Sequence, residues 1–185
     1  MEYNLFPEGG DAVLFEKKLF PTVMAESFRD VTPEFVKGMG GRALICDIDN
    51  TLVTYDDPVP TDEVARWFDS MREAGISVAF VSNNERERVE LFNSSLGFPA
   101  YPKSGKPKTK WIKAAMEATG TDESAAILLG DQLLTDAAAA NFAGIRSIIV
   151  PPIRDKKTLF FRFKRAIEKP YVKKFVRIHG IYKRG

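Results

Sequence analysis

The chain of 185 residues is long enough for one domain with a full core, and its apolar share of 44% and charged share of 28% are ordinary for a globular protein. No segment is long and apolar enough to predict a membrane-spanning helix, and the acidic start, residues 1–11, lacks the pattern of a signal peptide. We therefore expect a cytoplasmic protein, and Cys46, the only cysteine, excludes an intrachain disulfide.

Charge is distributed unevenly along the chain, although the net charge is only +2. The segment 154–185 contains twelve Lys and Arg residues against two Asp and Glu residues, so it carries +10 while the preceding residues carry −8. A basic segment attached to an acidic body predicts contact with something anionic.

Strands and helices are predicted to alternate along most of the chain. The apolar run Ala43–Cys46 is typical of a strand buried on both faces, Thr32 is suited to cap a helix start, and Thr61-Asp62-Glu63 is suited to open a helix. The predicted strands are 43–46, 76–81, 98–101, 125–129 and 145–150, and the predicted helices are 33–38, 61–75, 85–96, one ending at Gly120 and one from Thr135, as its cap, to Gly144. In the helix 85–96 the apolar positions available to the core are Val89, Leu91, Phe92 and Leu96. This alternation predicts βα units in one parallel sheet.

Polar groups follow three of the predicted strands at the point where each strand ends. They are Asp47 and Asp49 after the first strand, Ser82, Asn83 and Asn84 after the second, and Asp131 and Asp136 after the fourth, while Lys106 precedes the intervening helix. The carboxyl ends of parallel strands meet at one edge of the sheet, where α/β proteins bind ligands. Grouped carboxylates resist desolvation unless a cation compensates, and Mg²⁺ favours carboxylates together with phosphate oxygens. We therefore expect a site for Mg²⁺ and a phosphate dianion, although each residue alone also suits a cap, a turn or a solvated charge.

These motifs resemble, in order, the four motifs of haloacid dehalogenase (HAD) superfamily phosphatases. They are Asp47-Ile-Asp49-Asn50-Thr51-Leu52, Ser82-Asn83-Asn84, Lys106-Pro107 and Gly130-Asp131-Gln132-x-x-Thr135-Asp136. Their form, with Leu19-Phe20-Pro21 upstream and Pro151-Pro152-Ile153 downstream, is similar to the YqeG-like branch of subclass IIIA. The resemblance implies a Rossmann-like three-layer α/β/α sandwich with a central parallel sheet of about five strands. Mitochondrial relatives in this branch are phosphatidylglycerophosphate phosphatases, which brings forward a lipid phosphate as substrate.

The resemblance implies a catalytic or metal-binding role for four aspartates. Asp47 would attack phosphorus and form an aspartyl-phosphate, and Asp49 would protonate the leaving oxygen and then activate water. The Asp47 side chain, the Asp49 backbone carbonyl and Asp131 would hold Mg²⁺. Asp136 would support the metal site.

The resemblance also implies a phosphate-binding role for residues of the second and third motifs. Ser82, the backbone amide of Asn83 and Lys106 would hold the phosphoryl oxygens. Lys103 and Lys108 lie near enough in the sequence to take the place of Lys106, so three lysines remain open for this role.

Spacing predicts how the chain is organised around this site. Residues 1–185 are expected to form one domain, with a catalytic core at about 42–150, an N-terminal extension 1–41 and the basic segment 154–185. No cap domain fits between the motifs, so the site should be open, with the loop Leu52–Pro60 over the strand end.

The expected function is Mg²⁺-dependent phosphomonoester hydrolysis, with phosphatidylglycerophosphate as the first named substrate. A phosphoprotein, a sugar phosphate or a nucleotide are alternative substrates for the same chemistry. A non-catalytic, basic-tailed binding module is the alternative from another class, and the intact pair Asp47 and Asp49 argues against it.

The basic segment has two competing interpretations. Leu159, Phe160, Phe163 and Ile167 recur at helical spacing with basic residues between them. Such a helix can lie on an anionic membrane, which would make the protein peripheral to it, or its apolar residues can cover the sheet. Nucleic acid is less favoured, because few aromatic residues form an obvious stacking array. The oligomeric state stays open.

Overall fold

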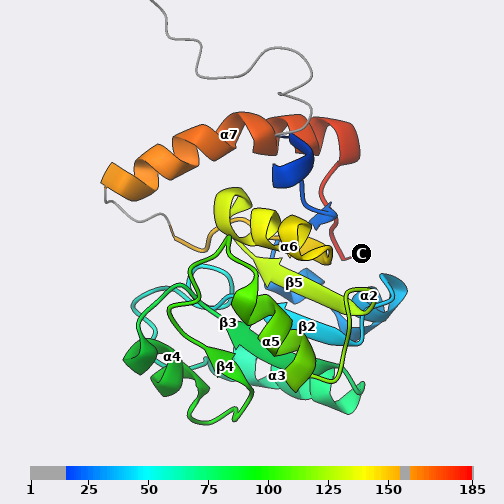
Figure 1. Ribbon diagram of the computed structural model, residues 1–185, viewed down its shortest axis with the longest axis vertical. Helices are drawn as coiled ribbons and strands as arrows, with labels where there is room; N and C mark the ends of the chain where they lie inside the picture. The colour runs from blue at the N-terminus through cyan, green and yellow to red at the C-terminus, as the bar shows by residue number, and fades with distance from the viewer. Residues whose placement is uncertain (1–15, 155–158, 185) are drawn as a thin grey trace, which may run out of the picture.

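A single parallel sheet forms the centre of the computed structural model, which describes residues 16–154 and 159–184, except for the side chains of 159–161 (Figure 1). Its strands are β1 (Val23–Met24), β2 (Ala43–Cys46), β3 (Ser77–Val81), β4 (Ala100–Tyr101), β5 (Ala126–Gly130) and β6 (Arg146–Ile149). They are arranged in the order β1-β6-β5-β2-β3-β4, and every pair is parallel. β2 therefore lies inside the sheet, between β3 and β5.

All five expected strands are present, and a sixth strand, β1, was not expected. β1 contains only two residues, Val23 and Met24, which pair with Ile148 and Ile149 of β6 at the edge of the sheet. Two residues are too few to produce a periodic pattern, so the sequence carries no usable signal for this strand.

The helices follow the predicted order. They are α2 (Pro33–Gly38), α3 (Asp62–Glu73), α4 (Arg86–Asn93), α5 (Lys110–Ala118), α6 (Ala138–Ala143) and α7 (Leu159–His179), with a 3₁₀ turn at Phe28–Asp30 and a π turn at Leu133–Ala137. The predicted cap at Thr32 is confirmed, because its hydroxyl accepts from the Phe35 N–H at 3.2 Å. The helix start predicted at Thr61 is also capped, since the Thr61 hydroxyl accepts from the Val64 N–H at 3.3 Å.

Two expectations about these helices are wrong. The helical chain begins at Leu133 rather than after Thr135, so Thr135 lies inside the π turn and does not cap α6. The Asp136 carboxylate instead accepts from the Gln132 N–H at 3.0 Å, which stabilises the start of the turn from within. Leu91 is 50% exposed, because it lies two residues from Val89 and one from Phe92, on the other side of α4.

Side chains that alternate along the strands bury both faces of the sheet. On one face, Leu44 and Phe80 pack with α3 and α4, where the rings of Phe68 and Phe92 lie edge-on to Phe80 at 5.5 Å. On the other face, Ile45 packs with the apolar sides of α5 and α6. The three-layer α/β/α sandwich is thereby confirmed, and residues 16–154 hold no cap domain.

The basic C-terminal segment contributes to this fold through α7, which crosses above α6 in Figure 1. Tyr171 and Phe175 are buried against Met24, Leu133 and Ile149, so the second half of the helix covers the β1–β6 edge. The first half differs: Phe163 is 62% exposed, and the expected apolar side chains Leu159 and Phe160 lie outside the described residues. None of the helices in the described ranges has the length and apolarity that a membrane crossing requires.

The packing of α3 on the sheet leads to a stability prediction for Phe68, which is fully buried against Phe80 and Phe98. Phe68→Ala should lower the free energy of unfolding by about 3–5 kcal/mol, because it removes apolar contacts and leaves a cavity. Phe142→Ala on α6 is the matched control, since Phe142 is 52% exposed, and it should change stability by less than about 0.5 kcal/mol. Urea unfolding followed by tryptophan fluorescence measures both, and equal losses would contradict this placement.

Candidate active site

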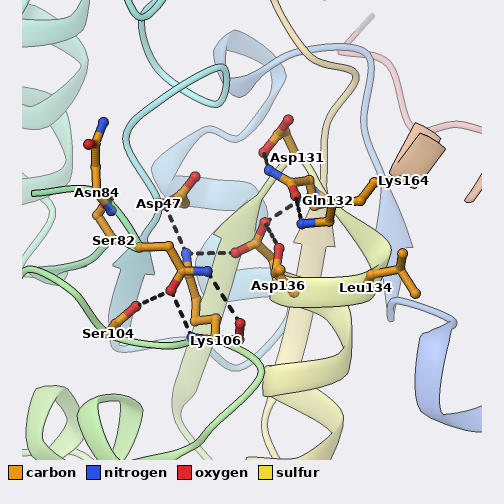
Figure 2. A network of polar contacts seen from close by, with 12 residues as sticks. Asp47, Ser82, Asn84, Ser104, Lys106, Asp131, Gln132, Leu134, Asp136 and Lys164 are labelled. Carbon is orange, nitrogen blue, oxygen red and sulfur yellow. Dashed lines mark hydrogen bonds and ion pairs between the residues drawn. The ribbon is translucent and has the colours of Figure 1, made fainter. Parts of the chain in front are cut away.

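The carboxyl edge of the sheet brings together the polar residues that follow β2, β3 and β5, as expected. A cavity of about 260 Å³ opens there. Its lining includes six of the seven predicted site residues, namely Asp47, Asp49, Ser82, Asn83, Lys106 and Asp136. The seventh, Asp131, lies beside them and borders a neighbouring groove (Figure 2).

Lys106 connects two of the aspartates. Its Nζ lies 2.8 Å from Asp47 Oδ1 and 2.7 Å from Asp136 Oδ1, and its side chain is 2% exposed (Figure 2). Burial disfavours the charged ammonium, but the two carboxylates outweigh it and raise the Lys106 pKa. Lys103 pairs with Glu85 on the surface and Lys108 is exposed, so Lys106 is the lysine that enters the site.

Asn83 holds the loop that carries Lys106. Its Oδ1 accepts from the Lys106 N–H at 2.7 Å and from the Ser104 hydroxyl at 2.8 Å, and its Nδ2 donates to the Lys106 carbonyl at 3.3 Å. This side-chain role was not expected, since the resemblance implied a role only for the Asn83 backbone amide. Ser82 is buried, and its oxygen accepts from the Asn84 N–H at 3.2 Å, which leaves the Ser82 O–H able to donate to a ligand.

The Asp49 side chain points to different partners from those of Asp47. Its Oδ1 accepts from Arg88 Nε at 3.2 Å and Nη2 at 2.9 Å, and its Oδ2 accepts from Asn84 Nδ2 at 2.8 Å. Both partners fix the direction of this carboxylate. The sequence marked Asn84 as polar but gave it no role, and Arg88 looked like an ordinary charge on the surface of α4.

Three buried carboxylates form a group at the centre of the site. Each of Asp47, Asp131 and Asp136 offers an oxygen, and these oxygens lie within 4.8 Å of one another. Burial raises the pKa of Asp47 to about 6 against the opposing effect of Lys106, and it raises the pKa of Asp131 to about 8 against that of Arg165. Several hard oxygen donors with excess negative charge suit a divalent cation such as Mg²⁺, so the residues fit the metal that the motifs imply.

Helix α7 supplies contacts to this site that the sequence did not predict. Arg165 donates to the Asp131 carboxylate, to the Asp131 carbonyl at 2.9 Å and to Glu168 at 3.0 Å. Lys164 extends toward Gln132 and donates to its Oε1 at 2.7 Å (Figure 2). Arg165 and Lys164 are each more than thirty residues from their partners Asp131 and Gln132, so no local pattern connects these pairs.

The loop after Asp49 borders the same cavity. Asn50 has a left-handed conformation, φ 65°, which asparagine tolerates better than most residues, and the chain turns there. Tyr55 lines the cavity, and burial together with the nearby carboxylates raises its pKa, so it stays a phenol. Arg88 Nη1 donates to the Pro58 carbonyl at 2.9 Å and thereby fastens the loop to α4.

Comparison with known proteins gives relatives along most of the chain. A model of the HAD-hydrolase-like family matches residues 103–152. The chain is 35% identical over 156 residues to the probable phosphatase YqeG of Bacillus subtilis (strain 168), which covers 84% of this chain and 91% of YqeG.

Solved structures are similar in fold. An uncharacterized protein from Listeria monocytogenes serotype 4b matches with a TM-score of 0.50 at 18% identity, over 63% of this chain and 84% of that chain. The cobalt-bound deoxy-D-mannose-octulosonate 8-phosphate phosphatase of Haemophilus influenzae matches with a TM-score of 0.47 at 15% identity, over 75% of this chain and 93% of that chain.

The raised carboxyl pKa values predict how pH acts on metal binding. In the unfolded chain the pKa of an aspartate is about 4. In the metal-free fold the pKa values of Asp47 and Asp131 are higher, about 6 and about 8. These two residues therefore stabilise the metal-free fold at low pH, and this stabilisation is lost as the pH rises toward the folded pKa values. Mg²⁺ binds the deprotonated carboxylates, so its thermal stabilisation should grow from about pH 5 to about pH 8. Melting temperatures with and without MgCl₂ at constant ionic strength test this.

Asp131→Asn is the control for this prediction, because it removes one carboxylate of the group and should abolish most of the Mg²⁺ effect. A stabilisation by Mg²⁺ that is as large in acid as in mild alkali would contradict metal binding at these aspartates.

Proposed function

Because the chain belongs to the YqeG-type family of HAD phosphatases, we propose that it hydrolyses phosphomonoesters in a Mg²⁺-dependent reaction through an aspartyl-phosphate on Asp47. The observation that carries the proposal is the buried contact of Lys106 with Asp47 and Asp136 inside a cavity at the sheet edge. This arrangement puts a nucleophilic carboxylate and a cation for the phosphoryl oxygens in one small space.

The proposed reaction has two steps, each with a balanced proton transfer. Asp47 attacks phosphorus and the bond to the ester oxygen breaks, while Asp49 gives its proton to that leaving oxygen. Asp49 then takes a proton from water, and the resulting hydroxide displaces Asp47 and releases phosphate. Arg88 and Asn84 contact the two Asp49 oxygens and fix the direction of the ionised side chain, which is the form that takes the proton from water.

Charge neutralisation and positioning carry most of the proposed catalysis, as is general for phosphoryl transfer. Ser82, the Asn83 backbone amide and Lys106 would hold the phosphoryl oxygens. Mg²⁺, when bound, supplies charge neutralisation for those oxygens and for the carboxylates. Asp47, Asp131 and the Asp49 backbone carbonyl would hold it, with support from Asp136.

The substrate proposal rests on an apolar groove next to this site. The groove has a volume of about 710 Å³ and begins at Asp131. Its apolar lining comes from the sheet edge and from α7 and includes Met24, Leu133, Ile149, Pro151 and Val172. Because the phosphate site is open and uncapped, a substrate with a phosphate head and an apolar chain can occupy both, and phosphatidylglycerophosphate has this form.

The exposed face of α7 supports the same class of substrate. Arg162, Lys169 and Lys173 are exposed and form no ion pair with any described residue, and the exposed ring of Phe163 lies among them in sequence. Basic residues near an anionic membrane contribute about 1 kcal/mol each. We therefore include peripheral contact with anionic lipid in the proposal.

Asp47→Asn should abolish turnover, because a carboxamide is nearly isosteric with the carboxylate but is a poor nucleophile. Phosphate release from p-nitrophenyl phosphate with Mg²⁺ should fall by at least about three orders of magnitude, while the fold is kept. Asp69→Asn, on the exposed side of α3, is the matched control and should keep full activity. Near-native turnover in the Asp47 variant would eliminate the covalent mechanism.

The groove predicts that activity depends on the length of an apolar chain. For n-alkyl phosphates kept below their micelle concentration, kcat/KM should rise with each added methylene, by up to about fourfold, until the groove is filled. Ala166→Trp should flatten this series, because Ala166 lines the groove. Ala118→Trp, on the exposed side of α5, is the control and should leave the series steep.

A flat series in the unmodified protein would favour a sugar phosphate, a nucleotide or a phosphoprotein as substrate. Sedimentation with anionic and with neutral vesicles tests the basic face of α7 separately. Equal recovery with both vesicle types would remove membrane contact from the proposal.

A further inference from the structure

Arg165 contacts Asp131, directly after the end of β5, through both the side chain and the backbone of Asp131. One nitrogen contacts the Asp131 carboxylate, and Nη1 donates to the Asp131 backbone carbonyl at 2.9 Å. Arg165 comes from α7, the last helix of the chain, and it lines the apolar groove rather than the cavity that holds Lys106. Lys106 and Arg165 therefore contact the group of three carboxylates from two sides, Lys106 from the cavity and Arg165 from the apolar groove.

A buried carboxylate on the same helix keeps Arg165 in this position. Glu168 is 2% exposed, and its Oε2 accepts from Arg165 Nη1 at 3.0 Å. Its Oε1 accepts from the Leu134 N–H at 2.9 Å, three residues beyond Asp131. Arg165 and Glu168 thus connect α7 to the residues on either side of Gln132, Arg165 through Asp131 and Glu168 through Leu134.

Asp131 contacts Arg165 and is also one of the three carboxylates that could hold a metal ion. Its oxygen lies within 4.8 Å of oxygens of Asp47 and Asp136, so a cation bound among the three would lie beside the guanidinium. The Arg165 guanidinium and such a cation would repel each other strongly, because both would contact the buried Asp131 carboxylate and little water would screen them there. The two cations Lys106 and Arg165 thus contact four carboxylates, those of Asp47, Asp131, Asp136 and Glu168.

We propose that Arg165 is a positioning residue that sets the divalent-cation affinity of this site by competing for Asp131, so that metal binding and the docking of α7 oppose each other. The inference rests on the metal site of the proposed function. Coupling between two binding events is reciprocal. If the Arg165–Asp131 contact weakens metal binding by some factor, metal binding therefore weakens the Arg165–Asp131 contact, and with it the docking of α7, by the same factor. The C-terminal helix thereby responds to the state of a site more than thirty residues away in the sequence.

Calorimetric titration of the full chain with Mg²⁺ and with Mn²⁺, at one fixed pH for all variants, tests the competition. Arg165→Gln should tighten the Kd by at least about tenfold, since the competing charge is gone. Arg165→Lys keeps that charge and should restore the Kd to within about threefold of the unmodified protein. Arg177→Gln, on the exposed part of α7, is the matched control with no change expected.

Hydrogen exchange of the α7 amides measures the reciprocal effect. Mg²⁺ should speed exchange in α7 of the unmodified protein and should not do so in Arg165→Gln. A merely structural role would lower the melting temperature of Arg165→Gln without tightening its Kd, and an unchanged or weaker Kd overturns the proposal. Absence of metal binding in all four proteins would overturn the metal site itself, whereas equal binding in all four overturns only the role of Arg165.

Discussion

The burial of several carboxylates at one edge of the sheet is the constraint on which the site depends. Asp47, Asp131 and Asp136 are almost fully removed from water, where a carboxylate charge is costly unless a cation or a hydrogen-bond donor lies beside it. Lys106 lies between two of them and Arg165 contacts the third. Such buried charges add little to stability, but they make an electrostatic environment that suits a further cation.

The backbone around β5 is shaped so that these carboxylates can meet. Gly130 ends the strand directly beside Asp136, where an added Cβ would lie 2.4 Å from Asp136 Cγ. Only glycine leaves room for that approach. The π turn that follows brings Asp136 back to accept from the Gln132 N–H, so the same residue stabilises the turn and faces Lys106. Local helix geometry is therefore adapted to the site, which is a frequent use of π turns.

Helix α7 joins the basic segment to the catalytic edge. Its second half packs Tyr171 and Phe175 on the β1–β6 edge, and this packing places Arg165 and Lys164 over the end of β5. The same helix forms one wall of the apolar groove, and its exposed basic residues Arg162 and Lys169 are part of that wall. The interpretation that the tail covers the core is thus confirmed for the second half of α7, and contact with a membrane stays a prediction.

The sequence alone determined which apolar runs form the buried strands, that helices begin at Thr32 and Thr61, and which residues follow each strand. These features depend on local periodicity and on short spacings. The sequence also determined that Asp47, Ser82 and Asp136 meet, since parallel strands align their carboxyl ends. Tertiary structure decided which of three lysines enters the site, because only the loop held by Asn83 places Lys106 beside Asp47. It also decided the pairs Arg88 with Asp49 and Arg165 with Asp131, which are 39 and 34 residues apart. A charged residue on a helix looks the same in sequence whether it faces solvent or a buried carboxylate, and only the packing of that helix distinguishes the two.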